Sequence, residues 1–297
     1  MTSADPLEVD PFAADDPSAR IDHLHRTRRA THRSMKLHGE ALWAEEQRFS
    51  GRFNAPANID ALPANRRPAA MAATQATHLA DAHLYGLDEA ATTTAVALGA
   101  RMVEFTSSDA GPDVQRAWSP VAAPPATSGL LRWASGIGYD TLGVPLIAAH
   151  WGPTPEGTWL AFWADNRVAV RNDMTQDGRT RSQAQLVLQE FGPLATTGIA
   201  TALIPRPDAR PPTQPPAVPR AEPSPAPIDP LLALTATVVA SWALLTTPGA
   251  ARLITRGPGG AGAARDRRAG LTPRPAILAI EPIDTQTIQR LGRKEPP

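Results

Sequence analysis

The alternation of apolar and polar positions is clearest between residues 128 and 165, where three apolar runs follow one another. A short run at Gly129–Trp133 precedes two longer ones, Val144–Trp151 and Thr158–Asp165, which are joined by the residues GPTPEG. Because proline and glycine in a short connection favour chain reversal, the two longer runs predict an antiparallel hairpin. In TWLAFWAD both alternating faces are apolar, which is typical of a central strand covered on both sides.

Helical patterns surround this hairpin. The longest runs from about residue 17 to 49. It begins at Asp16-Pro17, an N-cap followed by proline in the first turn, and its narrow apolar stripe must dock on another surface. The remaining predicted elements are helices over 69–84, from Leu87-Asp88 to about Gly99 and from Leu231 to about Thr247, short strands near Val103–Thr106 and at Ala276–Ile280, and Leu186–Glu190 as either a strand or a helical turn.

Together these elements predict an α+β fold. An N-terminal helical region packs on a small, mostly antiparallel sheet, and a proline-rich linker leads to a C-terminal helix plus strand. Whether these last two elements dock back on the sheet or form a separate module stays open. The predicted boundaries are a disordered acidic tail at 1–15, the helical region with the tryptophan-rich sheet at 16–204, the linker at 205–230, the helix–strand segment at 231–285 and a loose tail at 286–297.

The composition narrows the chemistry that the chain can carry. Among its 297 residues, 29 Lys plus Arg balance 29 Asp plus Glu, so the chain as a whole is not a polyanion binder, although local basic patches remain. The absence of cysteine excludes disulfides, thiolate metal sites and a cysteine nucleophile. The acidic N-terminus carries no apolar segment of the kind found in signal peptides, so we expect a cytoplasmic protein.

Two basic stretches, 20–36 and 252–274, are the features best suited to a polyanionic partner. The first holds six basic side chains and one acidic one, and the second holds six basic side chains. Neither contains a base-reading motif, so we expect contact with nucleic-acid phosphates, with a solvated basic face or a protein partner as alternatives. Histidines 23, 25 and 32 would strengthen this contact as the pH falls through about 6.5. The candidate contact residues are Arg26, Arg28, Arg29, Arg33, Arg265, Arg267 and Arg268.

A small hydrolase is the alternative from another functional class. His150 lies near the end of one hairpin strand, Asp165 ends the other and Asp140 lies in the preceding loop, an arrangement that suits an acid–base site. Antiparallel pairing, however, puts His150 and Asp165 near opposite ends of the hairpin, which favours a core histidine with a backbone partner. No metal site is predicted, because the histidines clustered between residues 23 and 38 have no carboxylate at ligand spacing.

Three further patterns have simpler interpretations. Gly257, Gly259 and Gly262 match G-x-G-x-x-G, but we expect a helix rather than a strand before them, so a flexible connection is favoured and no cofactor is predicted. The four tryptophans between 133 and 163 fit a packed core better than a stacking platform. Residues 231–251 are uncharged, as in a membrane span, but a single apolar stripe opposite small residues is typical of a soluble helix.

The segments GLLRWASGIG (129–138), GVPLIAAHWGP (143–153) and GTWLAFWAD (157–165) resemble a set of uncharacterised actinobacterial proteins associated with phage-like and other mobile elements. The similarity extends to 229–245 and 266–271. That family has no assigned activity, so the resemblance implies no site residues. We expect a non-catalytic interaction protein of a mobile element that contacts nucleic acid through its basic segments. The alternatives are a small hydrolase with an acid–base site near His150 and a membrane-tethered accessory protein anchored through 231–251.

Overall fold

The computed structural model describes residues 7, 10, 12, 14–50, 67–109, 123–154, 157–196, 202–205 and 230–282. Their strands form one mixed sheet in the order β5-β4-β3-β2-β1-β8-β7, with β6 paired to β4 beside that path. The strands are β1 (His83–Leu87), β2 (Gly129–Trp133), β3 (Leu146–Pro153), β4 (Gly157–Asp165), β5 (Leu194–Thr196), β6 (Ala202–Pro205), β7 (Ala251–Arg256) and β8 (Ala276–Pro282). The helices are α1 (Pro17–Ser50), α2 (Arg67–Asp81), α3 (Glu89–Asp109), α5 (Asn166–Gln176), α6 (Arg181–Phe191), α7 (Pro230–Thr246) and α8 (Gly259–Arg268). The predicted α+β class is confirmed.

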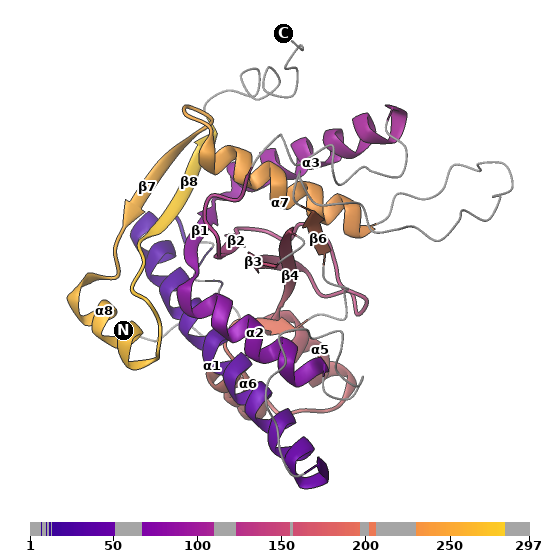
Figure 1. The fold of residues 1–297 in the computed structure, drawn as a ribbon, viewed down its shortest axis with the longest axis vertical. Coiled ribbons are helices and arrows are strands. Elements are labelled where there is room, and N and C mark those ends of the chain that lie inside the picture. Colours follow the sequence, from indigo (N-terminus) through magenta and orange to yellow (C-terminus); the bar gives the residue numbers. More distant parts are fainter. Residues whose placement is uncertain are drawn as a thin grey trace, which may run out of the picture.

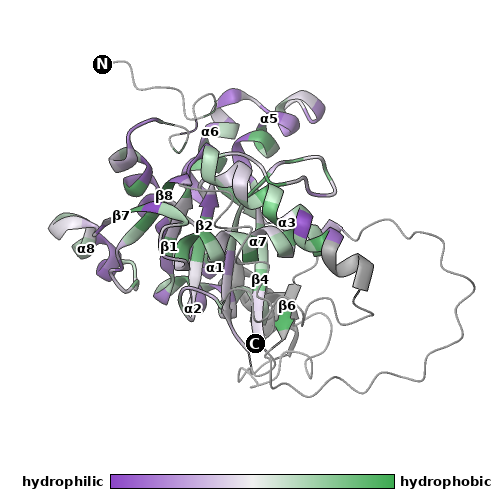
Figure 2. Cartoon of the chain, turned by 90° about the horizontal axis from the view of Figure 1, so that it is seen from above, coloured by the Kyte–Doolittle hydropathy of each residue, from purple (hydrophilic) through white to green (hydrophobic). Residues whose placement is uncertain are grey.

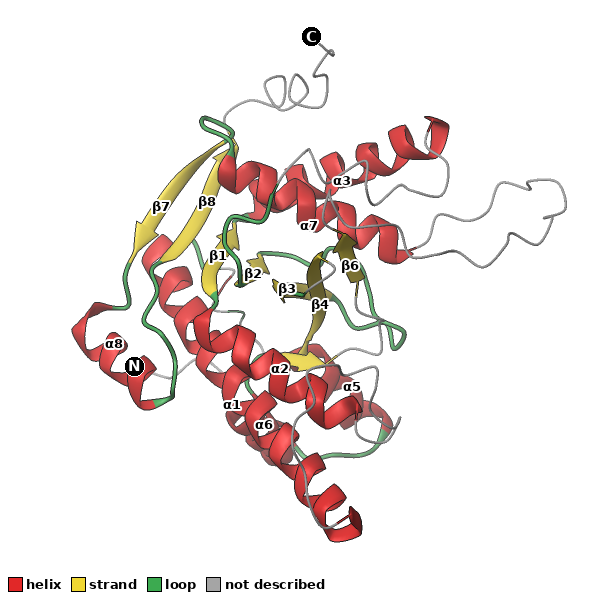
Figure 3. Ribbon diagram, viewed as in Figure 1, coloured by secondary structure: helices red, strands yellow, loops and turns green. Residues whose placement is uncertain are grey.

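Helices cover both faces of the sheet (Figure 1, Figure 3). α1 and α2 pack on one face, and α3 and α7 pack on the other. The first layer buries Leu24 and Trp163, whereas the second buries Trp133 and Phe162. Trp163 and Phe162 are neighbours on β4, and because side chains alternate along a strand this one strand contributes to both layers. The sequence prediction of a strand covered on both sides is therefore confirmed.

The predicted hairpin is present as β3 and β4, which pair antiparallel with Trp151 opposite Leu160. Trp133, Trp151 and Trp163 are at most 2% exposed and belong to the core, whereas Trp159, the fourth tryptophan of the predicted cluster, is half-buried. The indole of Trp151 packs edge-on against Trp242 of α7, with the ring centroids 5.2 Å apart. The aromatic side chains therefore join the hairpin to the C-terminal helix.

β1 is one of the strands that the sequence pattern missed, together with β5, β6 and β7. The helix predicted over 69–84 is α2, which ends at Asp81, and His83–Leu87 then forms a strand parallel to both β2 and β8. The strand predicted near Val103–Thr106 is wrong, because Val103 lies in α3, and of the two alternatives left open for 186–190 the helical one is present, within α6. The physical reason is shared, because a short apolar run alone does not distinguish a buried strand from a helical turn.

The C-terminal elements belong to the same sheet, because β8 pairs with β1 and β7 pairs with β8. α7 carries mostly apolar residues (Figure 2), and every residue from Leu234 to Trp242 is buried. The predicted single apolar stripe is therefore wrong: the small residues also pack, so closely that a Cβ on Gly99 of α3 would lie 2.8 Å from the backbone nitrogen of Thr237. None of the helices in the described ranges is long and apolar enough to cross a membrane.

Two predicted segments lie largely outside the described residues: the linker at 205–230, apart from its end residues, and the tail at 286–297. The predicted disordered tail at 1–15 is described in part. Within it Leu7 and Phe12 are buried, and the carboxylate of Asp10 lies 2.6 Å from both Arg132 and Arg167. The prediction of disorder is wrong for these three residues, because each finds a partner distant in sequence.

Candidate nucleic-acid interface

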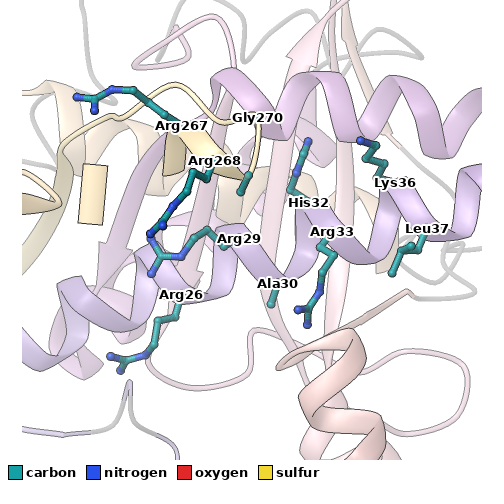
Figure 4. Close-up of a pocket in the computed structure, with 11 residues that line it drawn as sticks. Arg26, Arg29, Ala30, His32, Arg33, Lys36, Leu37, Arg267, Arg268 and Gly270 are labelled. Atoms are coloured by element: carbon teal, nitrogen blue, oxygen red, sulfur yellow. The ribbon is translucent and has the colours of Figure 1, made fainter. Parts of the chain in front are cut away.

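The first wall of the candidate interface is α1, which has an apolar side facing the core and a basic side facing away from it. Its core side buries Ile21, Leu24 and Met35 in the layer beneath the sheet. Side chains three or four positions apart share one side of a helix, and here that rule gathers basic residues away from the core. These residues are Arg26, Arg29, Arg33 and Lys36 (Figure 4).

The second wall is α8, which follows the edge strand β7. Residues 259–268 are helical, so the flexible glycine connection predicted there is wrong. A strand therefore does precede the G-x-G-x-x-G pattern and a helix follows it, contrary to the sequence prediction. The pattern still does not form a dinucleotide site, because β7 and β8 pair antiparallel, whereas that fold requires parallel strands on either side of the helix.

A buried carboxylate joins the two walls. Asp266 of α8 is fully buried, and its two oxygens accept hydrogen bonds from Arg28 at 2.9 Å and from Arg29 at 2.6 Å. The other end of the Arg28 guanidinium donates to the backbone oxygen of Ala82 at 2.8 Å. Burial lowers the pKa of Arg28, and the charge of Asp266 opposes that shift. Because Arg28 is itself fully buried, it is not the surface phosphate contact that the sequence predicted.

Between the walls lies an open groove with a volume of about 810 Å³. Among the described residues no acidic side chain lines it, and its apolar contacts are small or aliphatic. The predicted contact residues are thus brought together in part, from two segments more than 230 positions apart in the sequence. The basic side chains that line the groove are Arg26, Arg29, Arg33, Lys36, Arg267 and Arg268 (Figure 4).

Two of the predicted contact residues, Arg33 and Arg265, form hydrogen bonds to backbone oxygens of the protein itself. Arg33 lines the groove but also donates to the backbone oxygens of Gln189 and Glu190, at 2.8 and 2.9 Å. These carbonyls end α6, so a cation there is favoured by the helix dipole. Arg265 does not line the groove and donates to the oxygen of Ala261 one turn earlier in α8.

The histidines of α1 lie in surroundings that disfavour their charged form. His23, His25 and His32 are buried. Burial, followed by the charge of Arg132, lowers the pKa of His23 to about 3. Burial also lowers the pKa of the other two, and the positive neighbours of His32 act in the same direction. Burial therefore favours the neutral form of all three rings, which argues against the predicted strengthening of binding around pH 6.5.

The candidate hydrolytic residues are not brought together. His150 is fully buried, its Nδ1 accepts a hydrogen bond from the Trp163 indole at 2.8 Å, and burial lowers its pKa to about 3. Asp165 instead pairs with Arg167 at 2.6 Å. Asp140 accepts backbone N–H groups within its own loop. The acid–base site predicted from these three residues is therefore not formed, and His150 is a core histidine whose partner is an indole.

Comparison with known proteins does not place the chain: no family model matches it, and no curated protein and no solved structure is detectably similar. Across the described ranges, no group of three or more histidine or carboxylate side chains is arranged to hold a metal ion.

Asp266 is the site residue that the sequence analysis overlooked. It is the one acid in the run ARDRR, and a lone acidic residue between arginines is usually read as charge balance on a solvated face. The available signal was its position as a single acidic residue among arginines. Once the structure shows that this carboxylate is buried, it requires cationic partners from elsewhere in the chain.

Proposed function

We propose that this protein binds nucleic acid without catalysis, through the sugar–phosphate backbone, in the groove between α1 and α8. The observation that supports the proposal most is that two basic segments, distant in the sequence, line one groove to which no acidic side chain of the described ranges contributes. A chain with no net charge gains a local positive field by this means, and such a field attracts polyanions.

The lining residues also indicate how the nucleic acid would be contacted. Arg26 and Lys36 are ten residues apart, which corresponds to about 15 Å along α1. A nucleic-acid strand carries one phosphate per ~3.4 Å of duplex axis, so this wall spans about four phosphates. Among the described residues, the lining contains no phenylalanine, tyrosine, tryptophan, asparagine or glutamine side chain that would stack on or read a base, and its one ring, the imidazole of His32, is buried. Binding is therefore expected to be nearly independent of sequence.

The biological setting is part of the same proposal. A sequence-independent nucleic-acid contact suits the interaction protein of a mobile element that the sequence analysis expects, and a cytoplasmic location is part of the same proposal. The geometry around His150 gives no support to the hydrolase alternative, since its ring is buried and its acidic neighbours have other partners.

Binding is tested by fluorescence anisotropy with labelled 20-residue DNA and RNA, single-stranded and duplex. At ~50 mM salt, where phosphate contacts are strong, we expect binding whose logarithm falls with the logarithm of salt concentration at a slope of about −0.9 per phosphate, near −4 in total for a duplex. The variant R26Q/K36Q/R267Q/R268Q removes four groove cations. It is expected to weaken binding by at least about tenfold and to flatten the slope, because fewer counterions are displaced.

The matched control is R101Q/R171Q/R179Q/R252Q, which removes the same charge from exposed arginines outside the groove. It should bind within about twofold of wild type, since screening weakens distant surface charges. Equal losses in the two variants would show that net charge, not the groove, governs binding. An absence of binding by wild type to every oligonucleotide at this salt concentration would overturn the proposed function.

A further inference from the structure

We infer that Arg29 and Arg268 form a clamp for a single phosphate group within the groove. The inference rests on the proposed function and deepens it, because it assigns one subsite and its ligand chemistry: the non-bridging oxygens of a phosphodiester or of a terminal phosphate. It distinguishes two adjacent arginines, Arg267 and Arg268, that the basic composition of α8 does not distinguish.

The first evidence is the orientation of the side chains. In the view of Figure 4 the side chains of Arg29 and Arg268, one from each wall, point toward one another, whereas the side chain of Arg267 extends away from them. Arg268 is exposed and forms no ion pair with any residue in the described ranges. Two facing cations repel each other, and an anion between them converts that repulsion into attraction.

The second evidence is the support behind Arg29. Asp266 receives one hydrogen bond from Arg29, through Nη1 at 2.6 Å, so the remaining N–H donors of this guanidinium are available to a ligand. The side chain of Arg29 is 19% exposed, which leaves it within reach of the groove. The buried Arg28 balances the charge of Asp266, so Arg29 keeps its own positive charge for the ligand. Arg29 is therefore held in place before any ligand arrives.

The third argument is chemical. A guanidinium presents parallel N–H groups that match two phosphate oxygens, whereas a lysine ammonium is a compact point charge. Two guanidinium groups from opposite walls can grip one phosphate between them. The clamp thus predicts a dependence on arginine geometry, which a purely electrostatic attraction to the groove does not.

The decisive comparison is R268Q against R267Q, two substitutions with the same change of charge on adjacent residues of α8. In the anisotropy assay with a labelled 12-residue DNA, we expect R268Q to weaken binding about tenfold, the effect of losing one strong charge-assisted contact, and R267Q about twofold or less. R268K keeps the positive charge but loses the two parallel N–H groups of the guanidinium, so it should recover less than half of the binding free energy that R268Q loses. Equal effects of R267Q and R268Q, or full recovery by R268K, would overturn the clamp while leaving the proposed function in place.

A second probe separates the two levels of the proposal. Inorganic pyrophosphate at low salt should raise the melting temperature of wild type and of R267Q, but not of R268Q. If no oligonucleotide binds and pyrophosphate still shows this pattern, the clamp stands and nucleic-acid binding falls. If pyrophosphate stabilises no variant and R268Q binds DNA as R267Q does, the clamp falls.

Comparing 12-residue DNA with and without a 5′-phosphate assigns the subsite: preference for the phosphorylated end indicates a terminal phosphate, and equal affinity indicates an internal diester.

Discussion

Replacing Asp266 with alanine is expected to lower the free energy of unfolding by about 3–5 kcal/mol, the usual cost of removing one partner of a buried ion pair. The reason is that Arg28 would remain fully buried with no counter-charge. Arg29, whose contact to α8 through Asp266 is lost, would also be released. Since each kcal/mol shifts the melting temperature of a protein of this size by a few degrees, the loss corresponds to a fall on the order of 10 °C.

Urea denaturation measures this change directly. Asp173→Ala is the matched control, because Asp173 also pairs with an arginine, Arg179 at 3.0 Å, but both side chains are well exposed. A surface pair of this kind is worth below about 1 kcal/mol. Similar small losses in both variants would contradict the structural role of Asp266. The double variant Arg28→Met/Asp266→Leu should recover much of the stability, because it buries apolar groups where the pair had been.

Asp266→Ala is also expected to change nucleic-acid binding, in the direction opposite to the one that the change of charge alone predicts. Asp266→Ala removes a negative charge beside the groove, so charge alone predicts tighter binding of a polyanion. Because Asp266 holds Arg29 and joins α8 to α1, we expect weaker binding instead, measured by anisotropy well below the melting temperature. Tighter binding would show that the orientation of Arg29 contributes nothing.

Asp10→Ala is the second substitution expected to have a large effect, also about 3–5 kcal/mol. Asp10 bridges two arginines of the folded body, and one of them, Arg132, has a side chain only 1% exposed. Arg132 also donates to the backbone oxygens of Trp133 and Ile147, but Asp10 balances its charge. Asp15→Ala is the control in the same segment; its exposed side chain should change stability by no more than about 0.5 kcal/mol. A comparable result for both would mean that the N-terminal segment does not stabilise the fold.

The contribution of Asp10 is also expected to depend on pH. Burial alone would raise its pKa, but the charge of Arg132 and the hydrogen bond and charge of Arg167 outweigh burial and lower the pKa from 3.8 to about 2. A carboxyl with a lowered pKa stabilises the folded state fully above its unfolded value and loses that effect as the pH falls through the folded value. The stability difference between wild type and Asp10→Ala should therefore be constant from about pH 7 to 5 and shrink between about pH 4 and 2. A difference that is unchanged down to pH 2 would contradict the ion pairs.

The sequence by itself determined the elements that depend on patterns within a few neighbouring residues. The N-caps at Asp16 and Asp88 are present, accepting hydrogen bonds from the backbone nitrogens of Ser18 and Ala91. The hairpin of β3 and β4 follows from two long apolar runs around a turn, since strand period and turn chemistry act over a few residues. The α+β class follows from the same signals.

Long-range contacts decided what such patterns leave open. His83–Leu87 is a strand because β2 and β8 flank it, and parallel pairing joins residues far apart in the chain, which leaves no turn signal between them. The all-round burial of α7 likewise depends on the approach of α3 at Gly99. Each of these features depends on a partner that the local sequence does not specify.

The candidate interface divides in the same way. The sequence by itself determined that residues 20–36 and 252–274 are basic and that neither contains a base-reading motif. Only the tertiary structure decided that the two stretches face one groove and that Asp266 joins them. It also decided between neighbours of identical chemistry: Arg28 is fully buried and Arg29 reaches the groove. The physical reason is that successive side chains on a helix point in directions about 100° apart. Only packing against the rest of the chain determines which of those directions faces the interior.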